Sequence, residues 1–383
     1  DLNEAVARIT GVVTAASILV DSESEFTKPL RIVVTGPEEG SEIPGDQSYT
    51  IDVVNEGDTV TLTVRGNDSI AQMYGVYQIV QDLGVLYFHP EESFYPDDPG
   101  ATLPVDYDGT VQTPAFERRG FHEHTQHPIV MSDFLLRPEE EFKPYLENYL
   151  RWMARNRQNV LSFHMLKTVD LDTWIPYMQW FTGQAAEFGI RVGAVIGFAD
   201  QQQNAFRLIR EDNLDPETGE VLPDEVQIEE GIDRILESGL GQLGFQFGTS
   251  EFTKPEDSLA LSWLNTAARH MRDNHPDVVP YAWIHITCSL ESEDDGYYYH
   301  LPLQADEGLG AYAHTTMFYT LDHPAPVYDC EDFGHQKEFM EQASGTRELV
   351  FYPETAWWLG FDNNCPVVLP ITGWSRAYDI QQA

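Results

Sequence analysis

The sequence predicts an α/β protein in which a small N-terminal α/β domain precedes a (β/α)8 barrel of the TIM type. From about residue 116 onward, strand-like and helix-like segments alternate, and the strands are apolar along their length, as buried parallel strands are. No Gly-rich phosphate loop follows an early strand, which favours a barrel over an open doubly wound sheet. We therefore expect residues 1–112 to form an accessory domain and residues 113–383 to form the barrel.

The accessory domain shows three β-branched runs, at 30–35, 49–54 and 59–64, separated by Gly, Asp and Asn turns. Residues 69–83 then place apolar side chains at helical spacing. Asp68 or Ser69 is a suitable N-cap, and Gly84 ends the helix. A short strand at 85–88 completes the predicted domain.

The barrel region contains seven strand-like segments with helical segments between them. The strands are 118–121, 159–165, 190–198, 243–249, 279–286, 311–319 and 349–352, and the clearest helices are 142–155, 174–188, 227–238 and 258–274. Residues 366–383 predict a helix after the seventh strand, and no eighth strand follows. We therefore expect either that the chain is a fragment of a longer protein, with a barrel incomplete at its C-terminus, or that the barrel closes irregularly, and we favour the fragment.

The charge balance excludes one large class of function. The chain has 63 Asp and Glu against 22 Lys and Arg, a formal net charge of −41. Neutralising phosphates requires basic patches, so we expect no nucleic-acid partner. The acids are expected to form a solvated surface, as in salt-adapted or secreted proteins. No apolar run approaches the roughly 20 residues that span a bilayer, so no membrane association is predicted.

The chain begins at Asp1, which is consistent with a processed protein and predicts a secreted or periplasmic location. Its three cysteines show no CxxC pairing, so a structural zinc site is not expected. Cys288 and Cys330 follow the fifth and sixth barrel strands, which are neighbours, so they are the expected disulfide if one exists. The sequence leaves the oligomeric state open.

Three stretches resemble a known group of enzymes. Asn67–Phe88 is similar to the small α/β domain that precedes the barrel in β-hexosaminidases (glycoside hydrolase family 20) and α-glucuronidases (family 67). Pro114–Gly120 looks like their first barrel strand, and Trp152–Leu161 like their step into the second. The resemblance implies a barrel glycosidase. The hexosaminidase strand-four motif ends in an Asp-Glu pair, whereas Ser250-Glu251 stands here, so only Glu251 carries over, as a general acid.

Two acids end predicted barrel strands on the face where barrel active sites form. Glu251 follows the fourth strand and Glu354 follows the seventh. Glycoside hydrolysis needs one proton donor and one carboxylate at the anomeric carbon. The sequence therefore predicts Glu251 as general acid/base and Glu354 as nucleophile or base. Asp322, after the sixth strand, is a third candidate and could share the base role. Retention and inversion both stay open.

Histidines and tryptophans near strand ends suggest substrate contacts. We expect His122, His124, His164 and His285 to bond sugar hydroxyls, and Trp357 or Trp358 to stack on a sugar ring. The main prediction is a glycosidase acting on a plant or algal polysaccharide or its oligomers, without a metal or other cofactor.

Two alternatives stay open. One is a metal-dependent amidohydrolase-like barrel that uses His122 and His124, joined by His285 and His314, to bind Zn²⁺. The Asp and Lys that such barrels place on strands eight and four cannot be located in this sequence. The other alternative is a carbohydrate-binding barrel without catalysis.

Overall fold

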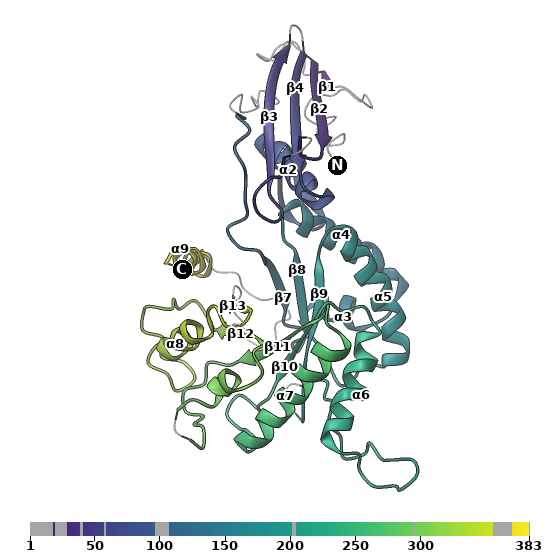
Figure 1. Ribbon diagram of the computed structural model, residues 1–383, viewed down its shortest axis with the longest axis vertical. Helices are drawn as coiled ribbons and strands as arrows, with labels where there is room; N and C mark the ends of the chain where they lie inside the picture. The colour runs from purple at the N-terminus through teal and green to yellow at the C-terminus, as the bar shows by residue number, and fades with distance from the viewer. Residues whose placement is uncertain are drawn as a thin grey trace. The chain divides into compact units, whose positions relative to one another are not determined.

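The computed structural model describes residues 18–19, 29–38, 41–56, 59–95, 107–200, 204–294, 296–354 and 370–382. The chain divides into two compact units (Figure 1). Unit 1 comprises residues 1–120, 143–160 and 184–190, and unit 2 comprises residues 121–142, 161–183 and 191–383. Each unit is described by itself. The expected boundary at residue 112 stays a prediction, because unit 1 also contains two later segments, 143–160 and 184–190.

Unit 1 is built on a mixed four-stranded sheet in the order β1-β2-β4-β3. Its strands are β1 (Ile18–Leu19), β2 (Pro29–Thr35), β3 (Tyr49–Glu56) and β4 (Thr59–Gly66). β2 and β4 run parallel, whereas β3 and β4 run antiparallel. The Val-, Ile- and Thr-rich sequence of these strands suits a pleated sheet with one covered face.

Helix α2 (Ser69–Asp82) covers that face. It begins where the Asp68 side chain accepts hydrogen bonds from the amides of Ile70 and Ala71, at 2.8 Å each, and it is followed by Gly84 at φ +88°. The predicted helix and both of its signals are thus confirmed. Tyr74 and Ile79 of the helix are buried against sheet residues such as Val64. The remaining elements of unit 1 are β5 (Leu86–His89), β6 (Glu92–Phe94) and α4 (Lys143–Arg155).

Unit 2 contains a curled seven-stranded sheet in which the strands follow one another in chain order, β7 to β13. The strands are β7 (Gly120–Glu123), β8 (Val160–His164), β9 (Arg191–Gly197), β10 (Gln242–Gln246), β11 (Val279–Ile284), β12 (Gly310–Thr315) and β13 (Leu349–Pro353). From β9 to β13 every neighbouring pair is parallel. β7 and β13 are at opposite ends of this order, yet the rings of His122 and Tyr352 lie 4.9 Å apart. The sheet therefore bends round on itself, as in an incomplete barrel.

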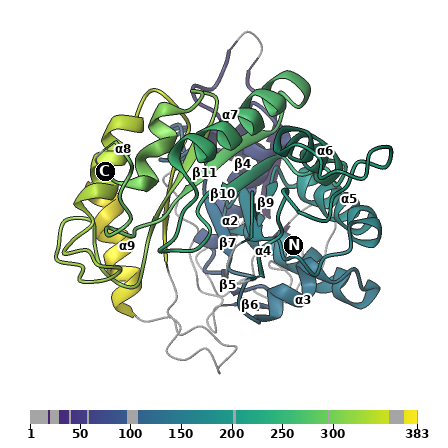
Figure 2. The same cartoon turned by 90° about the horizontal axis from the view of Figure 1, so that it is seen from below.

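Helices and short 3-10 turns connect the strands of unit 2. They are α3 (Val130–Leu136), η1 (Glu140–Phe142), α5 (Leu171–Glu187), α6 (Asp224–Leu236), α7 (Asp257–Asn274), η3 (Tyr298–Gln304), α8 (Gly334–Ala343) and α9 (Pro370–Gln382). Figure 2 shows α6 and α7 next to each other, with β10 and β11 nearby. This order of strand and helix matches the predicted alternation and gives the (β/α) arrangement. Within the described residues, every helix is too short or too polar to cross a membrane.

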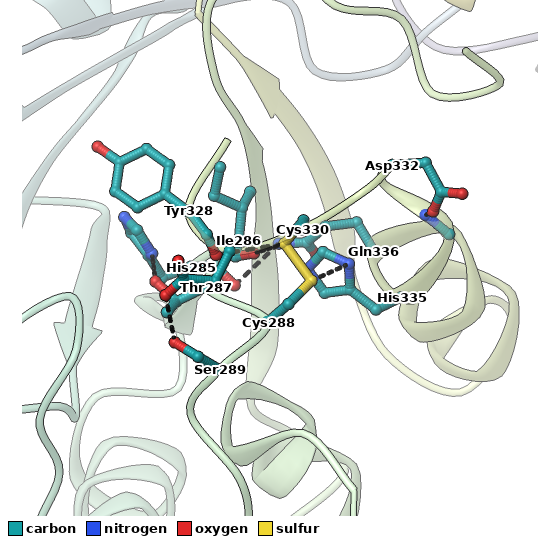
Figure 3. The surroundings of a disulfide bond; sticks show 12 residues. His285, Ile286, Thr287, Cys288, Ser289, Tyr328, Cys330, Asp332, His335 and Gln336 are labelled. Atoms are coloured by element: carbon teal, nitrogen blue, oxygen red, sulfur yellow. Dashed lines mark hydrogen bonds between the residues drawn. A yellow bond between two sulfur atoms is a disulfide. The ribbon is translucent and has the colours of Figure 1, made fainter. Parts of the chain in front are cut away.

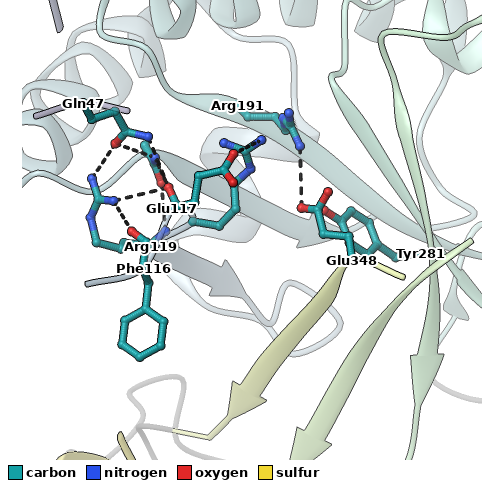
Figure 4. A network of polar contacts seen from close by, with 9 residues as sticks. Gln47, Phe116, Glu117, Arg119, Arg191, Tyr281 and Glu348 are labelled. Carbon is teal, nitrogen blue, oxygen red and sulfur yellow. Dashed lines mark hydrogen bonds and ion pairs between the residues drawn. The ribbon is translucent and has the colours of Figure 1, made fainter. Parts of the chain in front are cut away.

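A polar contact ties strands together at the end of the sheet where they begin. Glu348, just before β13, accepts a 2.5 Å hydrogen bond from the Tyr281 hydroxyl and lies 3.9 Å from the Arg191 guanidinium (Figure 4). Barrel residues at this N-terminal end serve stability, whereas catalysis is placed at the other end. An active site is therefore expected at the carboxyl ends of the strands.

The expected disulfide is present. Cys288 and Cys330 are bonded, and their Cα atoms are 5.2 Å apart. The bond joins the loop after β11 to the loop after β12, so it fixes two neighbouring loops at the carboxyl ends of the strands.

Candidate active site

Five buried or partly buried histidines gather at the carboxyl ends of the curled sheet. His122 and His124 come from β7 and the residue after it, His164 from β8, His285 from just after β11, and His314 from β12. The rings of His122 and His164 are 4.5 Å apart, those of His124 and His164 are 4.8 Å apart, and those of His285 and His314 are 5.6 Å apart. The four substrate-binding histidines predicted from the sequence thus lie in one region of unit 2.

Aromatic rings fill the space between these histidines. Trp283 lies 4.8 Å from the ring of His164 and 5.3 Å from that of His314. Tyr352 stacks on His314 at 5.0 Å. Burial in this aromatic setting lowers the pKa of His124 to about 3 and of His285 to about 3, and it lowers the pKa of His122, His164 and His314 as well. The imidazoles are therefore neutral near neutral pH.

Several polar atoms of this region are buried without a hydrogen-bond partner within the described part of the chain. They are both ring nitrogens of His164 and of His314, Nε2 of His122, Nε2 of His124, and the side-chain carbonyl of Gln246 at the end of β10. An unpaired buried polar atom costs about 1–3 kcal/mol. Ordered water or a polar ligand is the usual partner of such atoms.

Glu354 follows β13 directly and is held in place by its neighbours. Its amide donates to the Thr315 carbonyl at 2.9 Å, and its Oε2 accepts a hydrogen bond from the Met317 amide at 2.6 Å. Met317 adopts φ +58°, a turn that brings its N–H over the carboxylate. Burial raises the pKa of Glu354 to about 7, against the opposing effects of the Met317 amide and the Arg376 guanidinium. The nearby Glu251 charge raises it further.

Arg376, on α9, holds the turn that binds Glu354. Its guanidinium donates to the carbonyls of Met317 at 3.1 Å and Tyr319 at 2.8 Å, and it pairs with Asp379 at 3.3 Å. The side chain is buried, so this cation acts at close range. Nothing in the local sequence marks Arg376, because its contacts arise only when α9 reaches the loop after β12.

Glu251 is presented by a tight loop after β10. The amides of Thr249 and Ser250 both donate to the Thr253 carbonyl, at 2.9 and 3.2 Å, which folds the loop around Glu251. The Glu251 side chain is 27% exposed, and its Oε1 lies 3.9 Å from Nε2 of His285. Because His285 is neutral, this is a contact between a carboxylate and an uncharged ring. Nδ1 of His285 is fixed by the Thr287 hydroxyl at 2.7 Å.

Tyr328 is a further residue near the two carboxylates, and it could not be recognised from the sequence. Burial raises the pKa of Tyr328, and the charges of Glu251 and Glu354 raise it further, so the phenol lies within electrostatic reach of both acids. Its ring packs on His285 at 5.0 Å and stacks on Phe252 at 5.8 Å. Figure 3 shows Tyr328 beside His285, two residues from Cys330 and its disulfide.

The backbone at Tyr328 is strained. Tyr328 and Asp329 adopt φ +52° and +62°, a region that non-glycine residues rarely occupy. Such conformations persist where the surroundings impose them and are frequent at functional sites. Here the Cys288 amide donates to the Tyr328 carbonyl at 3.2 Å, and the Ser289 hydroxyl donates to Asp329 at 2.8 Å.

The other predicted site residues have different outcomes. Asp322 pairs with the ammonium of Lys337 at 2.7 Å, and its side chain is 37% exposed, so its carboxylate already has a surface partner. Trp357 and Trp358 lie outside the described residues. In the described part of the chain, three potential metal-ligating atoms come within 4.8 Å of one another at Asp233–His270–His275, and a second such group, Cys288–Cys330–His335, contains the two disulfide-bonded cysteines. Neither group includes the histidines of the site, and the metal-hydrolase alternative stays a prediction.

Comparisons with known proteins identify the fold. No family model matches the chain, and no curated protein sequence matches it. Solved structures do. The GH20 β-N-acetylhexosaminidase from Streptomyces coelicolor A3(2) aligns with a TM-score of 0.53 and 11% identity, over 94% of this chain and 69% of that one. A mutant Streptomyces plicatus β-hexosaminidase in complex with its product GlcNAc aligns with a TM-score of 0.52 and 13% identity, over 94% and 68%.

A third structure is a family GH115 4-O-methyl-α-glucuronidase with specificity for decorated arabinogalactans. It aligns with a TM-score of 0.51 and 14% identity, over 92% of this chain and 51% of that one. The chain therefore spans about half to two thirds of the length of these enzymes. At these identities the likeness shows the fold alone, which is that of glycoside hydrolase barrels.

Proposed function

We propose that the protein is a glycoside hydrolase that uses Glu251 and Glu354 as its two catalytic carboxylates. One observation carries the proposal. Glu251 follows strand four and Glu354 follows strand seven, yet the charge of Glu251 acts on Glu354, and both charges act on the Tyr328 phenol. Hydrolysis of a glycosidic bond needs such a pair, one carboxyl protonated and one ionised. The glycosidase fold of the solved neighbours supports the same chemistry.

We propose a reversal of the roles that the sequence suggested. Burial raises the pKa of Glu354 to about 7, so this carboxyl keeps its proton at a pH where an ordinary glutamic acid has lost it. A pKa near the working pH is what a general acid needs. We therefore assign proton donation to Glu354. Glu251, on the loop after β10, then acts as the nucleophile or base.

The histidines supply the binding surface of the proposed site. Neutral imidazole nitrogens both donate and accept hydrogen bonds, as sugar hydroxyls do, and those of His122, His124, His164 and His314 include the unpaired atoms at the strand ends. A sugar hydroxyl would satisfy such an atom without introducing charge. We propose a plant or algal polysaccharide, or an oligosaccharide derived from one, as the substrate.

The assignment is tested by leaving-group dependence. After a turnover screen against aryl glycosides and plant and algal polysaccharides identifies a substrate, Glu354→Gln should lose about 10²–10⁴ in kcat on natural linkages. It should keep much more activity on activated aryl glycosides, whose leaving groups need little protonation. Glu251→Gln should lose activity on both. The exposed Glu220→Gln serves as the matched control.

Results that differ from this expectation favour another assignment or another function. The opposite pattern, with Glu251→Gln rescued by good leaving groups, would restore the roles first predicted from the sequence. Near-wild-type turnover in both variants would refute the carboxylate pair. Activity that is lost after chelation and restored by Zn²⁺ would favour the metal hydrolase. Sugar binding without turnover of any substrate would leave the carbohydrate-binding barrel.

A further inference from the structure

A cavity in unit 1 carries positive charge in an otherwise acidic protein. Its volume is about 270 Å³, and it is lined by Tyr49, Tyr74, Gln78, Gln112, Thr113, Pro114, Arg119, Asn156 and Arg157. All nine residues belong to unit 1, whereas the candidate active site belongs to unit 2. Its lining combines two guanidiniums, three side-chain amides and two tyrosines.

The two arginines have only neutral acceptors. Arg157 donates to the side-chain oxygens of Gln78 at 2.8 Å and Gln81 at 2.6 Å. Arg119 donates to the Gln47 amide at 2.8 Å and to the carbonyls of Phe116 and Arg157 at 2.5 and 2.9 Å (Figure 4). Among the described residues, neither guanidinium has a carboxylate oxygen within 4.0 Å, although acids outnumber Lys and Arg by 63 to 22.

Three acids of unit 1 near these arginines are engaged elsewhere: the Glu117 carboxylate pairs with Arg118 at 2.8 Å, and Asp82 and Asp68 have other partners. Asp82 accepts hydrogen bonds from the Tyr107 hydroxyl and, at 2.9 Å, from the Gln78 amide. Asp68 caps α2. The two guanidiniums are close enough that the charge of Arg157 opposes that of Arg119. Two like charges held together without a counter-charge are unfavourable unless an anion joins them.

Two further features describe the wall of the cavity. Tyr74 is fully buried and lines the cavity, and the Arg119 guanidinium lies 5.8 Å from the centre of its ring. Arg157 adopts φ +57° because it ends α4: the amide of Gln158 donates to the Met153 carbonyl and that of Arg157 to the Ala154 carbonyl, at 2.9 Å each. This helix end fixes the backbone from which the Arg157 side chain reaches the cavity.

We propose that this cavity binds an oxyanion carried by a sugar-sized ligand. Guanidinium groups bind carboxylate and sulfate oxygens through charge-assisted hydrogen bonds, and side-chain amides and tyrosine faces bind sugar hydroxyls and rings. The cavity volume suits a single sugar unit. The ligand is therefore an acidic sugar, bearing either a uronic acid carboxylate or a sulfate ester. The inference does not depend on the proposed catalytic function.

Isothermal titration calorimetry on the whole chain tests the proposal. The probes are glucuronate, galacturonate, galactose 6-sulfate, neutral glucose and inorganic sulfate. We expect one site that binds at least one acidic sugar and does not bind glucose. Arg157→Gln should weaken that binding 10- to 100-fold, as loss of a hydrogen bond to a charged group does. Tyr74→Phe, which removes only one hydroxyl, should weaken it a few-fold. Arg151→Gln, on the exposed face of α4, is the matched control and should bind like wild type.

Comparison of the probes shows which anionic group the cavity binds. Preference for the uronates identifies a carboxylate, and preference for galactose 6-sulfate identifies a sulfate ester. Equal affinity of the wild type, Arg157→Gln and Tyr74→Phe for an acidic sugar would overturn the proposal, and so would equal binding of glucose. Binding of inorganic sulfate alone would show an adventitious ion only. Circular dichroism of each variant confirms that lost binding is not lost folding.

Discussion

Tyr328 is the residue whose importance depends most on tertiary structure. Its phenol lies within electrostatic reach of both candidate catalytic acids, and its ring packs on His285. Because its pKa is raised, the phenol is neutral and can donate a hydrogen bond to an ionised carboxylate. Such a donor stabilises the charge of a nucleophile or base in place.

Tyr328→Phe tests this role, because it removes the hydroxyl and keeps the packed ring. We expect kcat on a confirmed substrate to fall about 10-fold or more, with a smaller change in KM. The pH profile should also shift, because the two carboxyls lose a shared neighbour. The exposed Tyr145→Phe on α4 is the control. Unchanged kcat and pH profile would reduce Tyr328 to a packing residue.

Glu354 should destabilise the folded protein at neutral pH. Its pKa is raised from 4.5 to about 7 by burial, so the native state holds a proton that the unfolded state releases. Below pH 4.5 the side chain is protonated in both states and its burial costs no ionisation energy. As the pH rises from 4.5 through about 7, only the unfolded state releases the proton easily, so the folded protein loses stability. Glu354→Gln does not titrate, and its amide oxygen can still accept from Met317.

We therefore expect Glu354→Gln to be more stable than wild type at pH 8, by roughly 1–3 kcal/mol, with the advantage shrinking between pH 7 and 4.5. Urea unfolding across this range measures it, with Glu220→Gln as control. A variant that is less stable at every pH would show that the ionised carboxylate is fully compensated by Met317 and Arg376.

At the scale of single elements, the sequence predicted the strands and helices better than their ends. Apolar runs and helical periodicity placed all seven barrel strands and α2, α4, α5, α6 and α7, because these patterns report burial directly. The fourth strand was expected to reach residue 249, but β10 ends at Gln246 because Thr253 closes a loop there. The sixth was expected to reach 319, but β12 ends at Thr315, before the turn at Met317.

Distance from a strand end decides which site residues could be predicted from the sequence. Glu251 and Glu354 follow strands and the histidines lie in or just after strands, so the alternation of strands and helices was enough to place them at one end of the sheet. Tyr328 and Arg376 lie far from any strand end. Their positions depend on a disulfide-linked loop and on α9, which no local pattern encodes.

Helix α2 packs closely on the sheet at Gly75. A Cβ added at Gly75 would lie 2.4 Å from Cγ1 of Val64 and 3.1 Å from the Tyr49 ring, so the helix needs a glycine there. Gly75→Ala should destabilise the protein by about 1–3 kcal/mol through overpacking, despite the better helix propensity of alanine.

Gly183 in α5 is the matched control, because nothing lies within 4 Å of an added Cβ. Gly183→Ala should stabilise by about 0.5–1 kcal/mol, since only the propensity gain remains. Chemical denaturation of both variants measures the two effects. If both changes had the same sign, close packing of α2 on the sheet would not be what decides stability at Gly75.

At the scale of the whole molecule, the net charge of −41 opposes folding by self-repulsion. Exposed ion pairs act the other way, but each contributes about 0–1 kcal/mol and salt weakens it too. Pairs such as Arg234 with Asp172 and Arg272 with Asp273 are of this exposed kind. With acids in nearly threefold excess, unpaired repulsion outweighs these contacts.

Salt should therefore stabilise the protein. The Debye length falls from about 30 Å at 0.01 M to about 3 Å at 1 M, so repulsion between distant surface acids is screened first. We expect Tm at pH 7.5 to rise by roughly 3–10 °C between 10 mM and 0.5 M NaCl. At pH 4.5 many carboxylates are protonated and the charge is smaller, so the same salt step should have less effect. A Tm that falls steadily with NaCl at pH 7.5 would mean that attractive pairs, rather than the acidic excess, dominate the surface electrostatics.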